Sequence, residues 1–83
     1  MRAPVVAVEI GDVVAVPSLG MGKTFRIAEV RSDGRISGPA VSIRRSREGE
    51  VRVVEINGSY FHGFEPRLVE LLIKKGSLNG RHL

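Results

Sequence analysis

Residues 41–56, Val-Ser-Ile-Arg-Arg-Ser-Arg-Glu-Gly-Glu-Val-Arg-Val-Val-Glu-Ile, contain two valine- and isoleucine-rich segments separated by a charged turn. The first segment alternates apolar with polar residues, which is typical of a strand with one face exposed to water. The second, residues 51–56, has the β-branched composition of another strand. The stretch therefore predicts a β-hairpin with arginines on its exposed face and in its turn.

Valine and isoleucine are also the main apolar residues of the rest of the chain. Twelve valines and six isoleucines stand against six leucines. β-branched side chains lose rotamer freedom in helices and pack well on pleated sheets. Ten glycines and four prolines divide the chain into short segments, as all-β folds require. A chain of 83 residues supports one small core, so we expect a single all-β domain.

We expect five short strands. They are residues 13–16, 24–31, 41–44, 51–56 and 69–73. Within the second strand Phe25 and Ile27 share one face by alternation, whereas Val30 is out of phase. This change of phase predicts a bulge near residues 28–29.

Three dipeptide or tripeptide signals predict where the chain turns. Ser32-Asp33-Gly34 is typical of a hairpin turn, and Asn57-Gly58 is the strongest short-range hairpin signal in the chain. Gly38-Pro39 predicts a break or a bend in the extended chain.

The segment before the last strand has two interpretations. The leucines between residues 68 and 72 have helical spacing, and Pro66 suits the first turn of a helix. Only about eight residues remain before Gly76, too few for a helix that is stable alone. We therefore predict a 3₁₀ turn at residues 66–68 followed by the closing strand, with a short helix as the alternative.

Two motifs carry a resemblance to a known superfold. Gly11-Asp12-Val13-Val14 opens a strand, and Phe64-Glu65-Pro66-Arg67-Leu68-Val69-Glu70-Leu71 closes the domain. With the meander between them, these motifs resemble the SH3-like small β-barrel, which includes Tudor, KOW-type and peptide-binding SH3 domains. The resemblance covers about residues 10–74 and implies a five-stranded barrel with a 3₁₀ turn before its last strand. A shared fold does not determine function.

This resemblance also divides the chain into three parts. We expect an N-terminal arm or edge strand at residues 1–9 and the barrel at residues 10–75. Residues 76–83, Gly-Ser-Leu-Asn-Gly-Arg-His-Leu, have the composition of a flexible C-terminal tail.

The basic residues predict a polyanionic partner. Ten of the 13 basic residues are arginines, and residues 31–52 alone carry an excess of three positive charges. The guanidinium fork matches phosphate geometry, so DNA or RNA is the expected ligand of the hairpin. The predicted phosphate-binding residues are Arg44, Arg45, Arg47 and Arg52, with Tyr60 stacking or packing beside them and Lys74 and Lys75 adding positive charge near the tail.

Two other interpretations of the same surface stay open. Glu48 and Glu50 lie in the same turn and could neutralise the arginines in water, where exposed ion pairs contribute little. Alternatively the chain is a protein-interaction or self-association module, with an apolar edge strand at residues 5–10 or a groove centred on Tyr60.

The aromatic run at residues 60–64 mixes core and surface residues. We expect Phe61 and Phe64 to face the core, with Gly63 changing the phase between them. Tyr60 and His62 should then be at least partly exposed.

The composition argues against catalysis, cofactors and membranes. Without cysteine the chain has no disulfide, no thiolate zinc site and no cysteine nucleophile. His62 and His82 lie twenty residues apart without acidic residues at ligand spacing, so we expect neither a metal nor a catalytic site. No apolar run approaches the roughly 18 residues of a membrane helix, and residues 1–10 make a poor signal peptide. A cytoplasmic location is expected.

Overall fold

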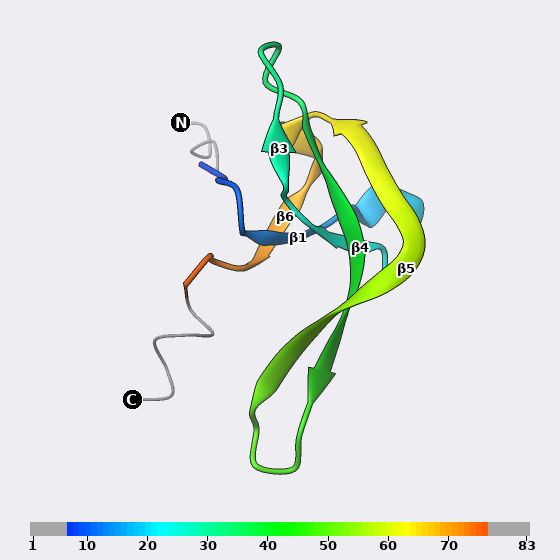
Figure 1. Cartoon of the computed structure of the whole chain (residues 1–83), viewed down its shortest axis with the longest axis vertical. Helices are drawn as coiled ribbons and strands as arrows, with labels where there is room; N and C mark the ends of the chain where they lie inside the picture. The colour runs from blue at the N-terminus through cyan, green and yellow to red at the C-terminus, as the bar shows by residue number, and fades with distance from the viewer. Residues whose placement is uncertain (1–6, 77–83) are drawn as a thin grey trace.

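The computed structural model describes residues 7–76, which form one antiparallel sheet of six strands with two short 3₁₀ helices (Figure 1). The strands are β1 (Val13–Ala15), β2 (Thr24–Arg26), β3 (Glu29–Val30), β4 (Ile36–Arg45), β5 (Val51–Phe64) and β6 (Glu70–Ile73). The 3₁₀ helices are η1 (Pro17–Leu19) and η2 (Pro66–Leu68). No α-helix occurs in residues 7–76, and the prediction of an all-β protein is confirmed.

The last strand of the sheet pairs with the first. The strand order is β3-β4-β2-β1-β6, and β5 also pairs with β4. Val14 of β1 lies opposite Phe25 of β2 and opposite Leu71 of β6, so β1 has a neighbour on each edge. The helix η2 directly precedes β6, which confirms the predicted 3₁₀ turn at residues 66–68 and makes the alternative of a short helix wrong.

The sheet is open, whereas the sequence predicts a closed five-stranded barrel. Among residues 7–76, β5 pairs only with β4, and β6 pairs only with β1. The physical reason is strand length: β4 and β5 have 10 and 14 residues, whereas β1 and β2 have three each. Beyond Ala40, the last residue of β4 that pairs with β2, the two long strands continue as a separate ribbon (Figure 1).

The sixth strand arises from a change of direction inside the predicted strand 24–31. That segment is divided into β2 and β3, and residues 27–28 between them belong to neither strand. The division lies next to the bulge predicted at residues 28–29. Both halves pair with β4, since Phe25 lies opposite Ala40 and Val30 opposite Ile36.

The core lies between β1, β2 and the first part of β4. Its fully buried members are Val14, Val16, Phe25, Ile27 and Ile36. Phe61 and Phe64 pack against this cluster, and the rings of Phe25 and Phe61 are stacked with centroids 4.9 Å apart. The predicted inward direction of both β5 phenylalanines is therefore confirmed, and Gly63 between them has a φ of +64°.

At Gly38 the backbone of β4 packs closely against the end of β2. A Cβ added to Gly38 would overlap the carbonyl oxygen of Arg26 and would lie 3.0 Å from the backbone nitrogen of Ala28. Of the predicted break or bend at Gly38-Pro39, the break is wrong, because β4 runs through both residues, while its register with β5 shifts on either side of them. Glycine is required here by close packing of two backbones and not by a turn.

The hairpin predicted at Asn57-Gly58 is also wrong. β5 continues through these residues, and Gly58 takes up a φ of +79° inside the strand. Opposite Ala40, β5 has extra residues, because Pro39 pairs with Tyr60 whereas Val41 pairs with Glu55. Since β4 is long enough to pair with both halves of β5, the Asn-Gly signal produces a large bulge and not a reversal of the chain.

The turn predicted at Ser32-Asp33-Gly34 is confirmed. The backbone N–H of Gly34 donates to the carbonyl of Arg31 (2.8 Å), and Gly34 has a φ of +90°. Asp33 Oδ1 accepts the backbone N–H of Arg35 at 3.0 Å, which is the local hydrogen bond that favours aspartate in turns.

Most of the predicted N-terminal arm and nearly all of the predicted tail lie outside the described residues. Of the arm, the structure describes residues 7–9, and these belong to no strand. Of the tail, it describes Gly76 alone.

Candidate nucleic-acid interface

The distal ribbon is the part of the β4–β5 hairpin past Ala40, residues 41–55, and Val41 at its base is still buried in the core. Its strands are joined by a tight turn in which the N–H of Ser46 donates to the carbonyl of Glu50 (2.9 Å) and the N–H of Gly49 to the carbonyl of Ser46 (3.0 Å). Ser46 Oγ also accepts the N–H of Glu50 at 3.1 Å. Gly49, with a φ of +88°, supplies the left-handed residue that such three-residue hairpin loops need. The turn therefore holds Arg47 and Glu48 at the tip.

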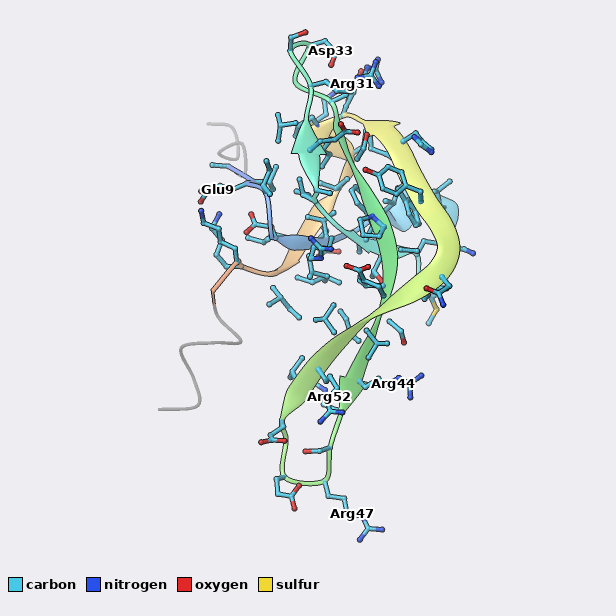
Figure 2. All side chains as sticks on the ribbon, viewed as in Figure 1. Glu9, Arg31, Asp33, Arg44, Arg47 and Arg52 are labelled. Carbon is cyan, nitrogen blue, oxygen red and sulfur yellow. The ribbon has the colours of Figure 1, made fainter. Side chains whose placement is uncertain are left out.

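Arg44 and Arg52 are direct cross-strand partners on the distal ribbon. Directly opposite residues of an antiparallel pair have Cα atoms about 4.5–5.5 Å apart and side chains on the same face. Both arginines are exposed, and Figure 2 shows them on the projecting part of the hairpin. The expected alignment of Arg52 with Arg44 across the two strands is confirmed.

The other two predicted arginines lie on different sides of the same ribbon. Arg45 pairs with Val51 and follows Arg44 in the strand, so its side chain belongs to the opposite face. Arg47 extends from the tip (Figure 2). The structure thus gathers four arginines on one ribbon and distributes them over both faces and the end.

The arginines of the distal ribbon differ from all the other described arginines in their partners. Eight arginines lie in residues 7–76, and the four outside the ribbon each pair with an aspartate or a glutamate. These four are Arg26 with Glu55, Arg31 with Asp33, Arg35 with Asp33 and Glu65, and Arg67 with Glu65. Within the same described residues, Arg44, Arg45, Arg47 and Arg52 form no ion pair, and neither do Glu48 and Glu50.

One open interpretation was that Glu48 and Glu50 neutralise the arginines of the ribbon. In residues 7–76 these two glutamates form no ion pair with those arginines. Between Arg44 and Arg52 the chain carries four positive and two negative charges, a net charge of +2. The remaining acid of the ribbon, Glu55, is engaged by Arg26 of β2.

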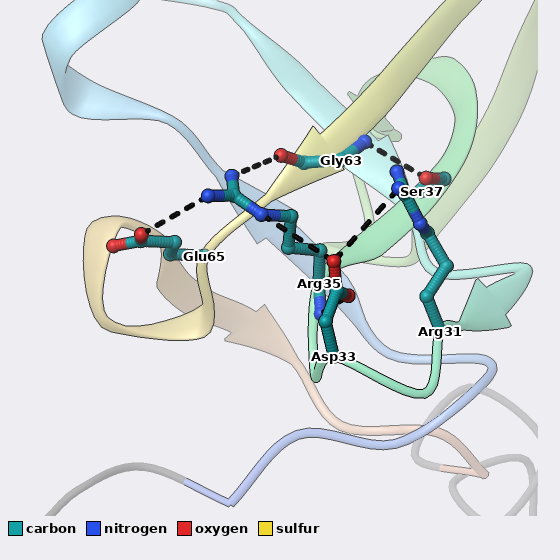
Figure 3. A network of polar contacts seen from close by, with 6 residues as sticks. All are labelled: Arg31, Asp33, Arg35, Ser37, Gly63 and Glu65. Atoms are coloured by element: carbon teal, nitrogen blue, oxygen red, sulfur yellow. Dashed lines mark hydrogen bonds and ion pairs between the residues drawn. The ribbon is translucent and has the colours of Figure 1, made fainter.

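Arg35, one of the four arginines outside the distal ribbon, lies in a network of polar contacts (Figure 3). Arg35 Nη1 donates to the carbonyl of Gly63 (3.0 Å), and its Nη2 lies 3.4 Å from Glu65 Oε2. The N–H of Gly63 in turn donates to Ser37 Oγ (2.9 Å), and Asp33 lies 3.7 Å from Arg35 Nε. The network joins the 31–35 turn to the end of β5, and all the charges in it have counterparts.

Tyr60 lies apart from the arginines. It pairs with Pro39, five residues along β4 from Arg44, which corresponds to about 17 Å of extended strand. Tyr60 is 43% exposed, and its ring lies against that of His62 with centroids 4.7 Å apart. The prediction that both residues are partly exposed is confirmed, but the structure does not place Tyr60 beside the ribbon arginines.

Lys74 and Lys75 follow β6 and form a clasp with Glu9 and Asp12, which precede the neighbouring strand β1. Lys74 Nζ lies 3.1 Å from Asp12 Oδ2 and 3.0 Å from Glu9 Oε2, and Lys75 Nζ lies 2.9 Å from Glu9 Oε1. Hydrogen bonding to Glu9 and then to Asp12 raises the pKa of Lys74. Both lysines are thus paired with acids of the same chain, unlike the ribbon arginines.

Asp12 is the centre of this clasp, and sequence reasoning noted it only as part of the opening Gly-Asp motif. Its side chain is fully buried. Burial raises the pKa of Asp12, but the hydrogen bonds donated by the N–H groups of Lys75 (2.7 Å) and Glu9 (2.8 Å) and by the Lys74 ammonium group outweigh it. The pKa of Asp12 is therefore below its usual value. The signal in the sequence was an aspartate directly before a buried strand.

Two of the open cavities lined by residues 7–76 border the sheet, and neither contains a catalytic set. One, of about 300 Å³, is lined by Gly22, Thr24, Val41, Ser42, Ile43 and Ile56. The other, of about 280 Å³, is lined mainly by Val13, Arg26, Val53, Ile73, Lys74 and Lys75. Across residues 7–76 no group of three His, Cys, Asp or Glu side chains is placed to hold a metal ion, and no helix of that part of the chain is long and apolar enough to cross a membrane.

The fold and the surface together define an all-β protein with a projecting ribbon of arginines. Comparison with protein-family models, with curated proteins and with solved structures finds no match for this chain.

Proposed function

We propose that this protein is a non-catalytic binding module whose distal ribbon contacts the phosphate backbone of nucleic acid. The observation that supports the proposal is the contrast between the two sets of arginines. All four described arginines outside the ribbon have acidic partners, whereas within residues 7–76 the four on the ribbon have none. An exposed cluster of guanidinium groups without partners of its own suits a polyanion.

The electrostatics of the ribbon support the same ligand. Like charges directly opposite each other on a β-sheet destabilise it, so the Arg44–Arg52 pair reduces the stability of the free hairpin. Phosphates of a nucleic acid would remove this repulsion on binding. Duplex DNA carries one charge per about 1.7 Å of axis, a density that can engage several neighbouring arginines at once.

The proposal places the four ribbon arginines at the interface and leaves three other predicted residues outside it. Lys74 and Lys75 are engaged by Glu9 and Asp12, and Tyr60 is distant along β4. These residues then act on binding only through the overall charge or through stability.

The SH3-like superfold is part of the proposal as well. A meander of antiparallel strands whose last member pairs with the first, with a 3₁₀ turn before that member, supports the resemblance. In this interpretation β2 and β3 are one bent strand, and the distal ribbon is an extension of the hairpin between the third and fourth strands of a small barrel.

Fluorescence anisotropy with labelled single- and double-stranded oligonucleotides at two salt concentrations tests the function. Each neutralised phosphate of a duplex contributes about −0.9 to the slope of log K against log salt. We expect binding to weaken steeply between about 50 and about 300 mM salt. An affinity that does not change over this range would contradict phosphate binding.

Two double variants that each remove two positive charges distinguish the contribution of the ribbon to binding from that of the rest of the surface. Arg44→Gln with Arg52→Gln removes two positive charges from the ribbon. Arg31→Gln with Arg67→Gln removes two from residues outside the ribbon. We expect the first pair to lower the salt slope by about two and the second to leave it nearly unchanged. Equal losses in both would mean that net charge, and not the ribbon, determines binding.

A second candidate function is a protein-interaction module. In the described residues β5 pairs with β4 alone, so its other edge presents unpaired backbone groups along a 14-residue strand. Such an edge can add a strand from another chain. Light scattering that shows a salt-insensitive dimer, together with no oligonucleotide binding, would favour this function over the first.

A further inference from the structure

The distribution of charge on the distal ribbon indicates how it would meet a nucleic acid. Arg44 and Arg52 occupy one face, Arg45 the opposite face, and Arg47 the tip. A ribbon that lay flat on a phosphate backbone would leave the arginine of its other face in water. Positive charges on both faces and at the tip favour a binding site in which phosphates lie on both sides of the ribbon.

The ribbon also has the dimensions and the free edges of an inserting element. Its four paired positions past the buried Val41, from Ser42–Val54 to Arg45–Val51, give it a length of about 13 Å. Past Ala40 no other described strand pairs with it. Two strands stand about 4.8 Å apart, and a two-stranded ribbon is narrow enough for the major groove of B-form DNA, which is about 12 Å wide.

We propose that the distal ribbon enters the major groove of duplex DNA with its tip first. This proposal rests on the proposed function and names the ligand within it. The groove is about 8.5 Å deep, which accommodates the turn and one or two residues of each strand. Arg44 and Arg52 then lie at the rim beside one phosphate backbone, and Arg45 lies beside the other.

The tip carries two of the side-chain types that can distinguish base edges in that groove. Arg47 and Glu48 occupy the turn, which three hydrogen bonds hold in place. Guanine presents two acceptors in the major groove, which a guanidinium group can bind together, and cytosine presents an amino donor that a carboxylate can accept. The tip therefore offers one guanidinium donor, Arg47, and one carboxylate acceptor, Glu48, and together they match a G·C pair. This gives Glu48, whose charge is unfavourable near phosphates, a role at the floor of the groove.

Other nucleic-acid surfaces fit these features less well. The minor groove of B-form DNA is about 6 Å wide, narrower than a two-stranded ribbon with its side chains. The major groove of A-form RNA is deep and too narrow for side chains to read. A single strand has only one backbone and cannot engage both faces of the ribbon in the same way.

Duplexes with a blocked major groove test the proposal directly. Two duplexes of one sequence are compared, one unmodified and one with bulky substituents on the pyrimidine C5 atoms, which project into the major groove. We expect the modified duplex to bind about tenfold more weakly or worse. An unmodified duplex saturated with netropsin, which occupies the minor groove, is expected to bind as before.

Single-arginine variants provide the second readout. Insertion predicts that Arg45→Gln and Arg44→Gln each lower the salt slope by about one, because each side chain contacts a backbone. Arg47→Gln should lower the preference for G·C-rich over A·T-rich duplexes about fivefold or more.

The outcomes separate the two proposals. Salt-dependent binding that is equal for both duplexes, or that is lowered by Arg44→Gln but not by Arg45→Gln, would overturn insertion and leave phosphate binding intact. The absence of binding to every oligonucleotide would overturn both proposals.

Discussion

The buried carboxylate of Asp12 accepts the backbone N–H of Lys75, 63 residues later in the chain, at 2.7 Å. The same carboxylate accepts the N–H of Glu9 at 2.8 Å and the ammonium group of Lys74 at 3.1 Å. One side chain thus holds the entry to β1 and the exit from β6 together. The contact extends the pairing of the first and last strands beyond their ladder.

Replacing Asp12 by Asn is expected to lower the free energy of unfolding by about 1.5–3 kcal/mol at neutral pH, since hydrogen bonds to a charged group are lost from a buried site. Urea unfolding measures this loss. The matched control is Glu9→Gln, which alters the exposed acid of the same clasp and should have a much smaller effect.

The contribution of Asp12 also depends on pH in a defined direction. Its folded-state pKa is lowered, so its stabilisation is present above the unfolded value of about 3.9 and is lost as the pH falls through the folded pKa. We expect the wild-type protein to lose more stability than Asp12→Asn when the pH is lowered from about 5 to about 2. Parallel pH profiles for the two proteins would contradict this role.

Gly38→Ala is expected to lower the free energy of unfolding by about 3 kcal/mol, because its Cβ would overlap the carbonyl oxygen of Arg26. The control is Gly22→Ala, where the space is open and only the φ of +80° opposes a side chain, at a cost of about 1–2 kcal/mol. Chemical denaturation compares the two. A Gly38→Ala protein as stable as wild type would show that β2 and β4 do not approach so closely.

Arg52→Gln is expected to raise the free energy of unfolding by about 0.5 kcal/mol at low salt, since it removes the like charge opposite Arg44. The gain should disappear in about 1 M salt, where the Debye length is only about 3 Å. Arg67→Gln, which removes an arginine paired with Glu65, should give no gain. If Arg52→Gln destabilises the protein at low salt, the two guanidinium groups are not in repulsion.

Glu50→Gln is expected to raise the affinity for duplex DNA about threefold at low salt, since a carboxylate a few ångströms from a phosphate repels it weakly in water. Glu50 closes the turn through its backbone, which the substitution retains. Anisotropy titrations measure the gain, and Glu29→Gln on β3 removes an equal charge away from the ribbon. A gain of equal size in both variants would assign the effect to net charge alone.

The features that were correctly predicted depend on neighbours in the sequence. Alternation predicts that Phe25 and Ile27 share one face, and both are buried in the core. The phase change at Gly63 predicts that both β5 phenylalanines face the core, and both pack against it. The Ser32-Asp33-Gly34 turn and the 3₁₀ turn before β6 follow from local residue chemistry.

The predictions that were wrong concern which distant segments a residue pairs with or packs against. Asn57-Gly58 favours a two-residue hairpin, but β4 offers a pairing edge to both halves of β5, and that longer ladder determines the outcome. Gly38-Pro39 favours a break, but the backbone of β2 crosses there and requires a residue without a side chain. Lys74 was assigned to the candidate site because its charge is visible in the sequence, whereas its partners, Asp12 and Glu9, lie more than sixty residues earlier.

The amino-acid sequence alone determined that the chain forms strands, that a charged turn joins residues 41–44 to residues 51–56, and that arginines occupy both strands and the turn between them. The tertiary structure decided that this hairpin extends beyond an open sheet, and that the arginines of the body have acidic partners whereas those of the ribbon have none within the described residues. The reason is physical: alternation is a property of neighbouring residues, whereas strand pairing and ion pairing depend on which distant segments the core brings together.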